Sequence, residues 1–332
     1  MFAKARLALA TPALANANNG NWQTAQRWAR MLTPRFAVTV MQSWQGGDEA
    51  ALIALHARRS ADSVQRWREQ NPHRPLILVL TGTDLYRDIA NDQSARRALA
   101  MADRLVVLNE LGMHSMPLPW RNKTRICLQS STSRQPVARK TSRHLRALMV
   151  GHLREEKDPR TYFDAAQLLA KRPDILLDHI GDALDPALGD AARSLAAQVP
   201  TYRWLGAQTH GRTRARIAQA HVLVHPSRME GGAHVVIEAL VSGTPVLASR
   251  IDGNVGLLGA AYDGYFDTGD AQGLAHMLER LRDDPTMLPK LQYQAALRAP
   301  LFAPARERGT LHELLDELLN ESTPISSLEN LS

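Results

Sequence analysis

The sequence predicts an α/β protein made of two parallel-sheet domains, and three observations support this expectation. Short apolar segments alternate with amphipathic segments of helical period along most of the 332 residues, a pattern typical of parallel strands covered by helices. The alternation breaks once, at the polar and basic residues 130–145, which carry turn residues and no hydrophobic period. The length also allows two domains that each bury a core.

The break defines the expected domains. We predict a first domain at residues 1–140 and a second at residues 141–302, with the linker at 130–145. A C-terminal helix at about 303–322 could pack back on the first domain. Ligands of parallel sheets bind beyond the carboxyl ends of the strands, so two such domains facing each other would share one cleft.

The elements follow from apolar runs, hydrophobic period and turn residues. In the first domain, strands are predicted at 6–14, 36–44, 75–86, 104–109 and 122–131, and helices at 24–32 and 95–102, while 49–70 mixes both signals. In the second domain, strands are predicted at 146–153, 174–181, 202–206, 221–227, 245–249 and 264–268. Helices are predicted at 159–172, 190–199, 212–220, about 233–242, 271–284 and 309–321.

Composition narrows the possible partners. The net charge is +7, but basic and acidic residues are interspersed and no nucleic-acid module is visible, so we expect anionic small molecules rather than nucleic acid. No apolar run reaches the ~18 residues of a membrane span, and membrane contact is not expected. The single cysteine, Cys127, favours a reducing compartment, which predicts a cytoplasmic protein with a buried structural thiol. Oligomeric state stays open.

The segment SRMEGGAHVVIEALVSGTPVLAS, residues 227–249, is the most informative motif. Glu230 lies in a glycine-containing loop and Glu238 eight positions later on a helix. The backbone N–H groups of Gly231, Gly232 and Ala233, with the helix dipole behind them, form an expected anion site. Glu238 can accept two hydrogen bonds from a ribose diol, and Glu230 lies where a sugar would sit. The motif therefore suits a nucleotide-sugar, and the adjoining His234 is assigned to the same site.

A second motif, VGHLREEKDPRTY at residues 150–162, follows the first strand of the second domain. Arg154 and Lys157 are expected to reach a diphosphate, Arg as a fork and Lys as a point charge. His152 is included as a nucleotide-sugar-binding candidate. No spacing of Cys and His typical of a metal site is present, so we expect a metal-free mechanism in which cations and the helix dipole neutralise the leaving diphosphate.

Two further motifs of the first domain contain candidate site residues. In LTGTDLYRD, residues 80–88, Asp84 could orient a sugar hydroxyl or cap a helix, and Thr83 is an acceptor-site candidate. In ALHARRSADS, residues 54–63, His56, Arg58 and Arg59 form a dense cationic cluster that is either a basic surface or a site for a small anion.

The remaining motifs are glycine-containing loops. In NNGNWQTAQRW, residues 18–28, the turn at Gly20 and Asn21 could let the backbone approach a second anion. In SRIDGNVGLLG, residues 249–259, Gly253 and Asn254 indicate a loop at the cleft edge, without assigned chemistry.

The E-x7-E arrangement of Glu230 and Glu238, within PS-x-x-EGG and EAL-x-x-G-x-PV-x-AS, resembles that of the retaining glycosyltransferases of the GT-B fold. This resemblance implies two Rossmann-like domains facing an interdomain cleft. The sequence departs from the family at His152, where an Arg usually stands, so either His152 or Arg154 would take its role. It also lacks the His that many of these enzymes place near the TGTD turn.

A combination of GNWQTAQRWA, ALHARRS, LTGTDLYRD, QSS, VGHLREEKDP, YRWLG, SRMEGGAHVVIEAL and SRIDGNVGLLG, from about residue 7 to about 308, resembles the selenosugar synthases of selenoneine biosynthesis. Such enzymes join a UDP-sugar, of the UDP-GlcNAc or UDP-glucose type, to selenophosphate, giving a 1-seleno sugar with release of UDP and phosphate. The resemblance implies no further cofactor. Two alternatives stay open: a glycosyltransferase with a lipid or polysaccharide acceptor, for which the ARRALA region offers a weak membrane-binding helix, and a non-catalytic nucleotide-sugar binding protein.

With this resemblance, the candidate residues take roles. Glu230, Lys157 and Arg154 are the catalytic candidates: Glu230 would bind sugar hydroxyls, and the two cations would stabilise the departing UDP. Glu238 would hold the uridine ribose. Arg58 and Arg59, with the turn at Gly20–Asn21, would hold the acceptor.

Overall fold

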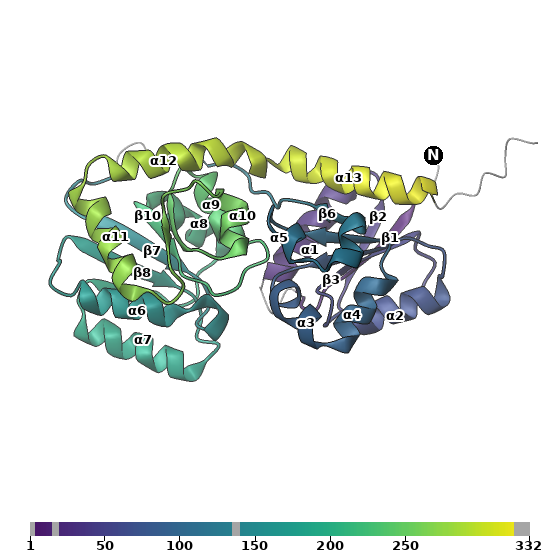
Figure 1. Cartoon of the computed structure of the whole chain (residues 1–332), viewed down its shortest axis with the longest axis horizontal. Coiled ribbons are helices and arrows are strands. Elements are labelled where there is room, and N and C mark those ends of the chain that lie inside the picture. The colour runs from purple at the N-terminus through teal and green to yellow at the C-terminus, as the bar shows by residue number, and fades with distance from the viewer. Residues whose placement is uncertain (1–3, 15–19, 135–139, 322–332) are drawn as a thin grey trace, which may run out of the picture. The chain divides into compact units, whose positions relative to one another are not determined.

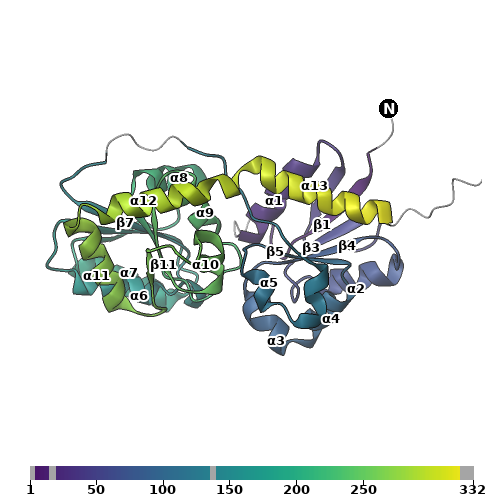
Figure 2. The same ribbon diagram turned by 45° about the horizontal axis from the view of Figure 1, so that its top comes forward.

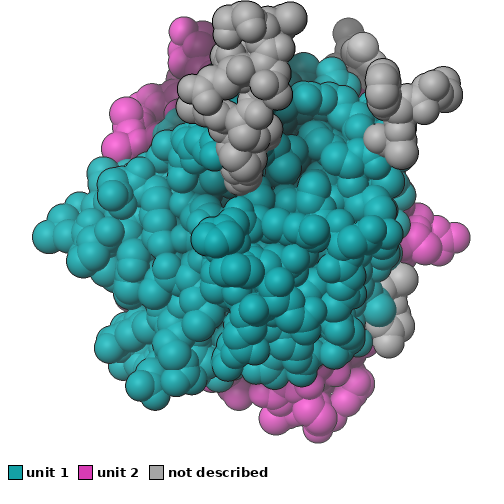
Figure 3. Space-filling model, turned by 90° about the vertical axis from the view of Figure 1, so that its right-hand side faces the viewer, with its two compact units in different colours: residues 1–129, 304–332 teal, residues 130–303 magenta. Residues whose placement is uncertain are grey.

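The computed structural model describes residues 4–14, 20–134 and 140–321. The chain forms two compact units, coloured separately in Figure 3: unit 1 comprises Met1–Gln129 with Pro304–Ser332, and unit 2 comprises Ser130–Ala303. The division falls at the start of the predicted linker rather than after it. Residues 135–139 of that linker and 322–332 at the C-terminus lie outside the described residues.

Unit 1 contains a six-stranded parallel sheet in the order β2-β1-β3-β4-β5-β6. Its strands are β1 (Arg6–Ala10), β2 (Ala37–Met41), β3 (Ala51–Leu55), β4 (Leu76–Leu80), β5 (Arg104–Val107) and β6 (Thr124–Ile126). Its helical segments are α1 (Gly20–Leu32), α2 (Ala61–Gln70), the π-helical η2 (Asp84–Asp88), α3 (Ile89–Asn91), α4 (Gln93–Met101), α5 (Gly112–Ser115), η3 (Leu118–Lys123) and α13 (Pro304–Glu321).

The four central strands of unit 1, β1, β3, β4 and β5, are buried on both faces, as expected for a parallel sheet, whereas the edge strand β2 is exposed to half-buried. Alternate residues of β1 point to opposite faces, so Ala8 packs in one core cluster and Leu9 in the other. One cluster contains Val64 and Trp67 of α2 together with residues of α4. The opposite cluster contains Trp28 of α1 and four leucines of α13: Leu311, Leu314, Leu315 and Leu318. The C-terminal helix therefore completes the core of unit 1, beside α1 (Figures 1 and 2).

Unit 2 contains a second six-stranded parallel sheet, in the order β12-β11-β10-β7-β8-β9. Its strands are β7 (Leu145–Val150), β8 (Ile175–Ile180), β9 (Tyr202–Trp204), β10 (Val222–His225), β11 (Val246–Ser249) and β12 (Tyr265–Phe266). Its helical segments are η4 (Glu155–Lys157), α6 (Pro159–Leu168), α7 (Pro186–Gln198), α8 (His210–Gln219), α9 (His234–Leu240), α10 (Asp252–Leu258), α11 (Ala271–Asp283), α12 (Met287–Arg298) and η5 (Ala299–Phe302).

Both sheets reverse their strand order beside their first strand. In unit 1 the sheet grows from β1 toward β2 on one side and toward β3 on the other. In unit 2 it grows from β7 toward β8 on one side and toward β10 on the other. The loops beyond the carboxyl ends of β1 and β3, and of β7 and β10, therefore diverge to leave a crevice where ligands bind in open α/β sheets.

Two predicted loops are helical instead. Helix α1 begins at Gly20, so Gly20 and Asn21 form its first turn rather than a turn before it. The predicted loop around Gly253 and Asn254 is helix α10, and both residues are buried. A glycine indicates a loop only where the chain adopts a backbone conformation that other residues avoid. Gly253 lies inside a helix, where its lack of a side chain permits close packing instead. Helix α12 was not predicted.

Candidate active site

The loops after β7 and β10 are joined side by side at the strand-order reversal of unit 2. The Arg228 backbone N–H donates to the Glu156 carbonyl at 2.9 Å, and Arg228 Nε lies 3.2 Å from Asp158 Oδ2. Between them, Lys157 Nζ donates to Glu230 Oε1 at 2.5 Å. The two motifs that the sequence singled out separately thus form one structure, because their strands are neighbours in the sheet.

Glu230 is an ionised carboxylate held between two basic side chains. Its side chain is 11% exposed and that of Lys157 is 16% exposed, and His225 Nε2 lies 3.2 Å from Glu230 Oε1. Burial alone would raise the pKa of Glu230, but the Lys157 charge and His225 outweigh it and hold that pKa well below its usual range. Burial lowers the pKa of His225, so its imidazole is neutral near pH 7.

A glycine of α10 fixes the backbone of the Glu230 loop. A Cβ added at Gly253 would lie 1.9 Å from the Glu230 carbonyl oxygen, closer than real Cβ atoms approach any backbone atom. Only glycine permits this contact. The segment around Gly253, to which no chemistry was assigned, therefore sets the position of Glu230.

Glu238 is the centre of a second, separate cluster. Its side chain is 6% exposed, and its Oε1 lies 2.5 Å from His210 Nε2, 3.4 Å from His234 Nδ1 and 3.8 Å from Arg214 Nε. Burial would raise the pKa of Glu238, but the hydrogen bonds from His210 and His234 outweigh it and lower that pKa to about 2. Glu238 is thus a buried carboxylate that contacts the half-exposed side chain of His210. It is not a solvated helix residue.

The residues before Glu238 form a tight entry to helix α9. Ala233 is its N-cap residue, and Gly231 and Ala233 are buried while Gly232 is half-buried. Helix α9 spans only seven residues, so its dipole is weaker than that of a long helix. His234 Nε2 lies 3.0 Å from the Ser130 carbonyl oxygen. The predicted contacts of these residues with a diphosphate stay predictions.

The two cation candidates before Lys157 differ in environment. His152 Nδ1 accepts a hydrogen bond from the Asp182 N–H at 3.0 Å, and burial, followed by the charge of Arg154, lowers the pKa of His152. The Arg154 side chain is 45% exposed, with Nε 4.0 Å from Glu156 Oε2. His152 is therefore neutral near pH 7, which leaves Arg154 as the permanent cation of the two.

In unit 1, the loops after β3 and β4 bring the predicted acceptor residues together. His56 Nε2 lies 3.1 Å from Thr83 Oγ1, and Arg58 Nε lies 3.1 Å from Asp88 Oδ2. His56 itself is 2% exposed, and burial lowers its pKa. The expectation of three cations here is thus wrong for His56, which is a buried neutral residue, and Asp88 offsets part of the charge of Arg58.

Asp84 has the contacts of a structural residue. It is fully buried, and its carboxylate accepts hydrogen bonds from the N–H groups of Ala57, Thr81 and Gly82 at 2.8–2.9 Å. These contacts are not those of a helix cap, because none of the three N–H groups belongs to a helix. The carboxylate instead joins the two loops, and the contact of Asp84 with a sugar hydroxyl stays a prediction. Among the described contacts, none joins Gly20 or Asn21 to this cluster, and Arg59 is exposed.

Three partners of the site carboxylates were not predicted from the sequence: His225 beside Glu230, and His210 and Arg214 beside Glu238. His225 ends strand β10, and a polar residue at the carboxyl end of an apolar strand is a signal that could have identified it. His210 and Arg214 lie four residues apart on α8, which places them on one face of that helix. Nothing local relates that face to Glu238, since the contact between α8 and α9 depends on the fold.

The described residues contain neither a candidate metal site nor a candidate membrane span. Within the described part of the chain, no group of three His, Cys, Asp or Glu residues is placed to hold a metal ion, and metal independence stays a prediction. In the same residues, no helix combines the length and apolarity needed to cross a bilayer. Cys127 is fully buried, and burial raises the pKa of its thiol, in agreement with a structural role.

Comparison with known proteins assigns the family. Residues 132–298, half of the chain, match the family described as glycosyl transferases group 1. The chain therefore belongs to this glycosyltransferase family.

Solved structures of low sequence identity share the fold of the whole chain. Sucrose-phosphate synthase from Thermosynechococcus elongatus is similar with a TM-score of 0.78 and 16% identity, over 96% of this chain and 100% of that one. HepE of Anabaena, in complex with UDP and glucose, has a TM-score of 0.71 and 16% identity, over 95% of this chain and 100% of that one. The lipopolysaccharide outer core galactosyltransferase WaaB has a TM-score of 0.69 and 13% sequence identity, over 94% of this chain and 99% of that one. The predicted GT-B class is confirmed, while a shared interdomain cleft stays a prediction.

Proposed function

We propose that this glycosyltransferase transfers a sugar from a UDP-sugar, of the UDP-GlcNAc or UDP-glucose type, to selenophosphate, giving a 1-seleno sugar, UDP and phosphate. The observation that carries the donor half is the partly buried pair of Lys157 and Glu230 at the strand-order reversal of unit 2. The acceptor half rests on the combination of motifs that resembles the selenosugar synthases.

The donor proposal follows from the charges of the site. Lys157 supplies a cation for a diphosphate, and Arg154 adds a second one from the same loop. Glu238 offers a carboxylate to a ribose diol, as in the role expected from the motif. HepE has been solved with UDP and glucose, and the pneumococcal O-GlcNAc transferase GtfA with UDP and GlcNAc, which supports UDP-sugars as the first donors to test.

The acceptor proposal uses a smaller set of charges than the sequence predicted. Arg58 and Arg59 keep their charge, whereas His56 is neutral and buried. Arg58 already contacts Asp88, so an anionic acceptor would compete with that carboxylate for the guanidinium. Arg59, which is exposed, is the residue we expect to contribute most to acceptor affinity.

The reaction requires two bond exchanges. Selenium attacks the anomeric carbon, the C1–Se bond forms, and the bond from C1 to the UDP oxygen breaks with its electron pair going to UDP. Ionised selenium is already a good nucleophile, so a general base is not obligatory. Water must then cleave the Se–P bond, giving phosphate and the seleno sugar. Lys157 and Arg154 would stabilise the negative charge that develops on the departing diphosphate.

The test incubates the purified protein anaerobically with UDP-GlcNAc or UDP-glucose, with and without selenophosphate, and follows UDP and sugar products by mass spectrometry. The proposal predicts UDP release that depends on selenophosphate, together with a product of seleno-sugar mass. Binding of the UDP-sugar without that product would remove the selenium acceptor, keep the glycosyltransferase assignment and direct the search to lipid and glycan acceptors.

A further inference from the structure

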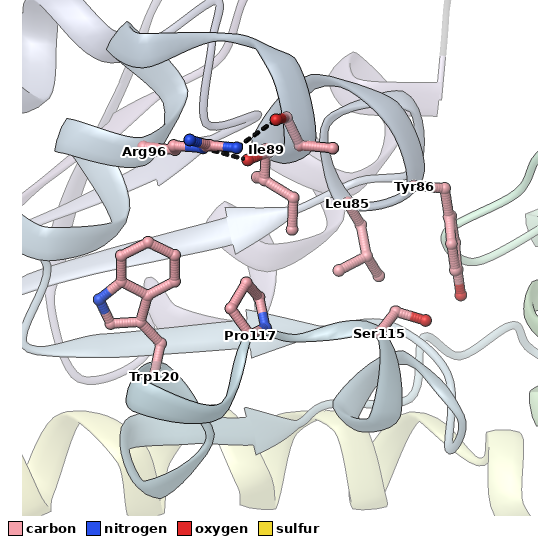
Figure 4. A pocket seen from close by; sticks show the side chains of 8 residues that line it. Leu85, Tyr86, Ile89, Arg96, Ser115, Pro117 and Trp120 are labelled. Atoms are coloured by element: carbon pink, nitrogen blue, oxygen red, sulfur yellow. Dashed lines mark hydrogen bonds between the residues drawn. The ribbon is translucent and has the colours of Figure 1, made fainter.

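Unit 1 contains an apolar pocket that the proposed reaction does not use. Its volume is about 530 Å³, and it is lined by Leu85, Tyr86, Ile89, Ala90, Arg96, Ser115, Pro117 and Trp120. Figure 4 shows Leu85 and Ile89 on one side of this space, with Pro117 and Trp120 on the opposite side. This volume is in the range of sites for small organic molecules. We call it the Trp120 pocket.

One end of the Trp120 pocket has the position of a ligand site in the fold. Its two walls are the segments that follow neighbouring strands: η2 and α3 come after β4, and α5 and η3 come after β5. Leu85, Tyr86 and Ser115 therefore lie beyond the carboxyl ends of β4 and β5, where parallel α/β units bind ligands, whereas η3, which carries Trp120, leads directly into the start of β6. Leu85 and Tyr86 belong to the π-helical segment η2, and π-helical turns are rare and frequently occur at functional sites.

One charged side chain stands in this apolar wall. Arg96 Nε donates to the Ile89 carbonyl at 2.9 Å, and its Nη2 donates to the Ala90 carbonyl, so the guanidinium is fixed in place. In the part of the chain that the structure describes, no carboxylate forms an ion pair with Arg96. The Trp120 pocket therefore combines apolar walls with one positive charge that an anion can satisfy.

Helix α4, which carries Arg96, is not arranged to lie on a membrane. Its apolar residues Ala95, Ala98 and Leu99 are buried in the core of unit 1, so the helix has no free apolar face for a bilayer. The membrane-binding role considered for the ARRALA region is therefore not supported by the packing of α4. It also favours a single small molecule over a lipid surface as the occupant of the Trp120 pocket.

We propose that the Trp120 pocket binds a small amphiphilic anion from solution, with an alkyl chain or ring against Trp120 and Ile89 and a phosphate group against Arg96. Selenophosphate has no apolar part, so this site is distinct from the acceptor site proposed above. Binding here does not require that the proposed reaction takes place.

Isothermal titration calorimetry with hexyl phosphate tests this proposal, because hexanol and inorganic phosphate provide the two halves of the same probe. We expect saturable 1:1 binding of hexyl phosphate and at least tenfold weaker binding of either half. Arg96→Gln should weaken hexyl phosphate binding roughly tenfold, as expected for loss of a charge-assisted contact. Arg97→Gln removes the neighbouring exposed charge of α4 and should change the affinity less than twofold.

Two further variants keep the test sharp if Arg96→Gln disturbs the fold. Arg96→Lys retains the charge and should retain most of the affinity, and Ala90→Trp should fill the Trp120 pocket and abolish binding. Thermal melting confirms that each variant is folded. Absence of hexyl phosphate binding to the wild-type protein, equal losses in Arg96→Gln and Arg97→Gln, or binding that survives Ala90→Trp would each overturn the proposal.

A last experiment distinguishes a small anion in solution from the headgroups of a lipid bilayer. Phosphatidylglycerol vesicles replace hexyl phosphate in a sedimentation assay, and we expect no binding. Vesicle binding in the absence of hexyl phosphate binding would place a bilayer on this face and overturn the proposal. All of these experiments measure binding rather than turnover. Their results can therefore be interpreted even if the selenophosphate reaction does not occur.

Discussion

At the residue scale, Glu230 and Glu238 have the same chemistry but different partners. Glu230 is paired with Lys157 and lies beside the neutral imidazole of His225. Glu238 is surrounded by two histidines and an arginine. A bound diphosphate would compete with Glu230 for Lys157, whereas a ribose could add hydrogen bonds to Glu238 without displacing a cation.

Loss of Lys157 should affect turnover far more than folding. We expect Lys157→Ala to lower kcat for UDP release on the order of 10²–10³-fold, the usual cost of removing one preorganised charge stabiliser. Steady-state kinetics with the UDP-sugar checks this. Lys290→Ala is the matched control, because the Lys290–Asp263 pair is exposed, with the lysine side chain 62% exposed. Near-normal kcat for Lys157→Ala would show that Lys157 does not stabilise the leaving group.

The ionisation of Glu238 predicts a specific loss of stability in acid. Its pKa is about 2 in the folded protein, against an ordinary value of 4.5. The unfolded chain therefore takes up a proton at this side chain first, and the stabilisation, present above pH 4.5, disappears as the pH falls toward 2. This shift corresponds to on the order of 3 kcal/mol.

Urea unfolding of the wild type and Glu238→Gln at pH 5 and pH 3 measures this effect. The free energy of unfolding of the wild type should exceed that of Glu238→Gln at pH 5, and the difference should shrink at pH 3. A difference that does not depend on pH would show that Glu238 is not held ionised by its surroundings.

At the element scale, helix α10 shows how a segment without functional side chains can control a site. Gly253 approaches the carbonyl of Glu230 more closely than any side chain would permit. The loop after β10 is thus fixed from one side by Gly253 and from the other by the contacts of Arg228 with the β7 loop. The geometry of Glu230 results from packing of three elements rather than from its own motif.

Gly253→Ala should displace the Glu230 loop. We expect a loss of about 1–3 kcal/mol in unfolding free energy, as for other overpacked sites, and a fall in kcat of about 10²-fold from misplacement of the site. Urea unfolding and kinetics measure both. Gly211→Ala in helix α8 is the control: its added Cβ meets nothing within 4 Å, so stability should rise slightly. Equal behaviour of the two variants would contradict the packing role of Gly253.

At the scale of the whole molecule, the chain leaves unit 1 at Gln129, builds unit 2, and returns to unit 1 with α13. The returning helix is held by its leucines and by a buried charge. Glu307, with a fully buried side chain, accepts hydrogen bonds from Arg27 Nε at 2.9 Å and Trp28 Nε1 at 2.6 Å. Folding of unit 1 therefore depends on residues at both ends of the chain.

Glu307→Ala should destabilise unit 1 strongly. It leaves the Arg27 charge and the Trp28 N–H without this partner, and breaking a buried pair costs about 3–5 kcal/mol. Asp316→Ala, on the same helix, removes a pair with Arg35 whose side chains are 47% and 43% exposed, and should cost less than about 1 kcal/mol. Urea unfolding of both variants tests this contrast, and similar losses would show that α13 is held by its leucines alone.

The sequence by itself determined the parallel α/β class, most strand and helix positions, and the motifs that contain Glu230, Glu238 and Lys157. These features are local, since hydrophobic period, glycine turns and residue spacing are all readable along the chain. The tertiary structure decided which residues meet: Glu230 with Lys157 because β10 pairs with β7, and Glu238 with His210 because α8 packs on α9. The tertiary structure also decided the ionisation of His56, because burial lowers the pKa of its imidazole and keeps it neutral near pH 7. Contacts between distant segments and the burial of a titratable group depend on strand order and packing, which no local pattern specifies.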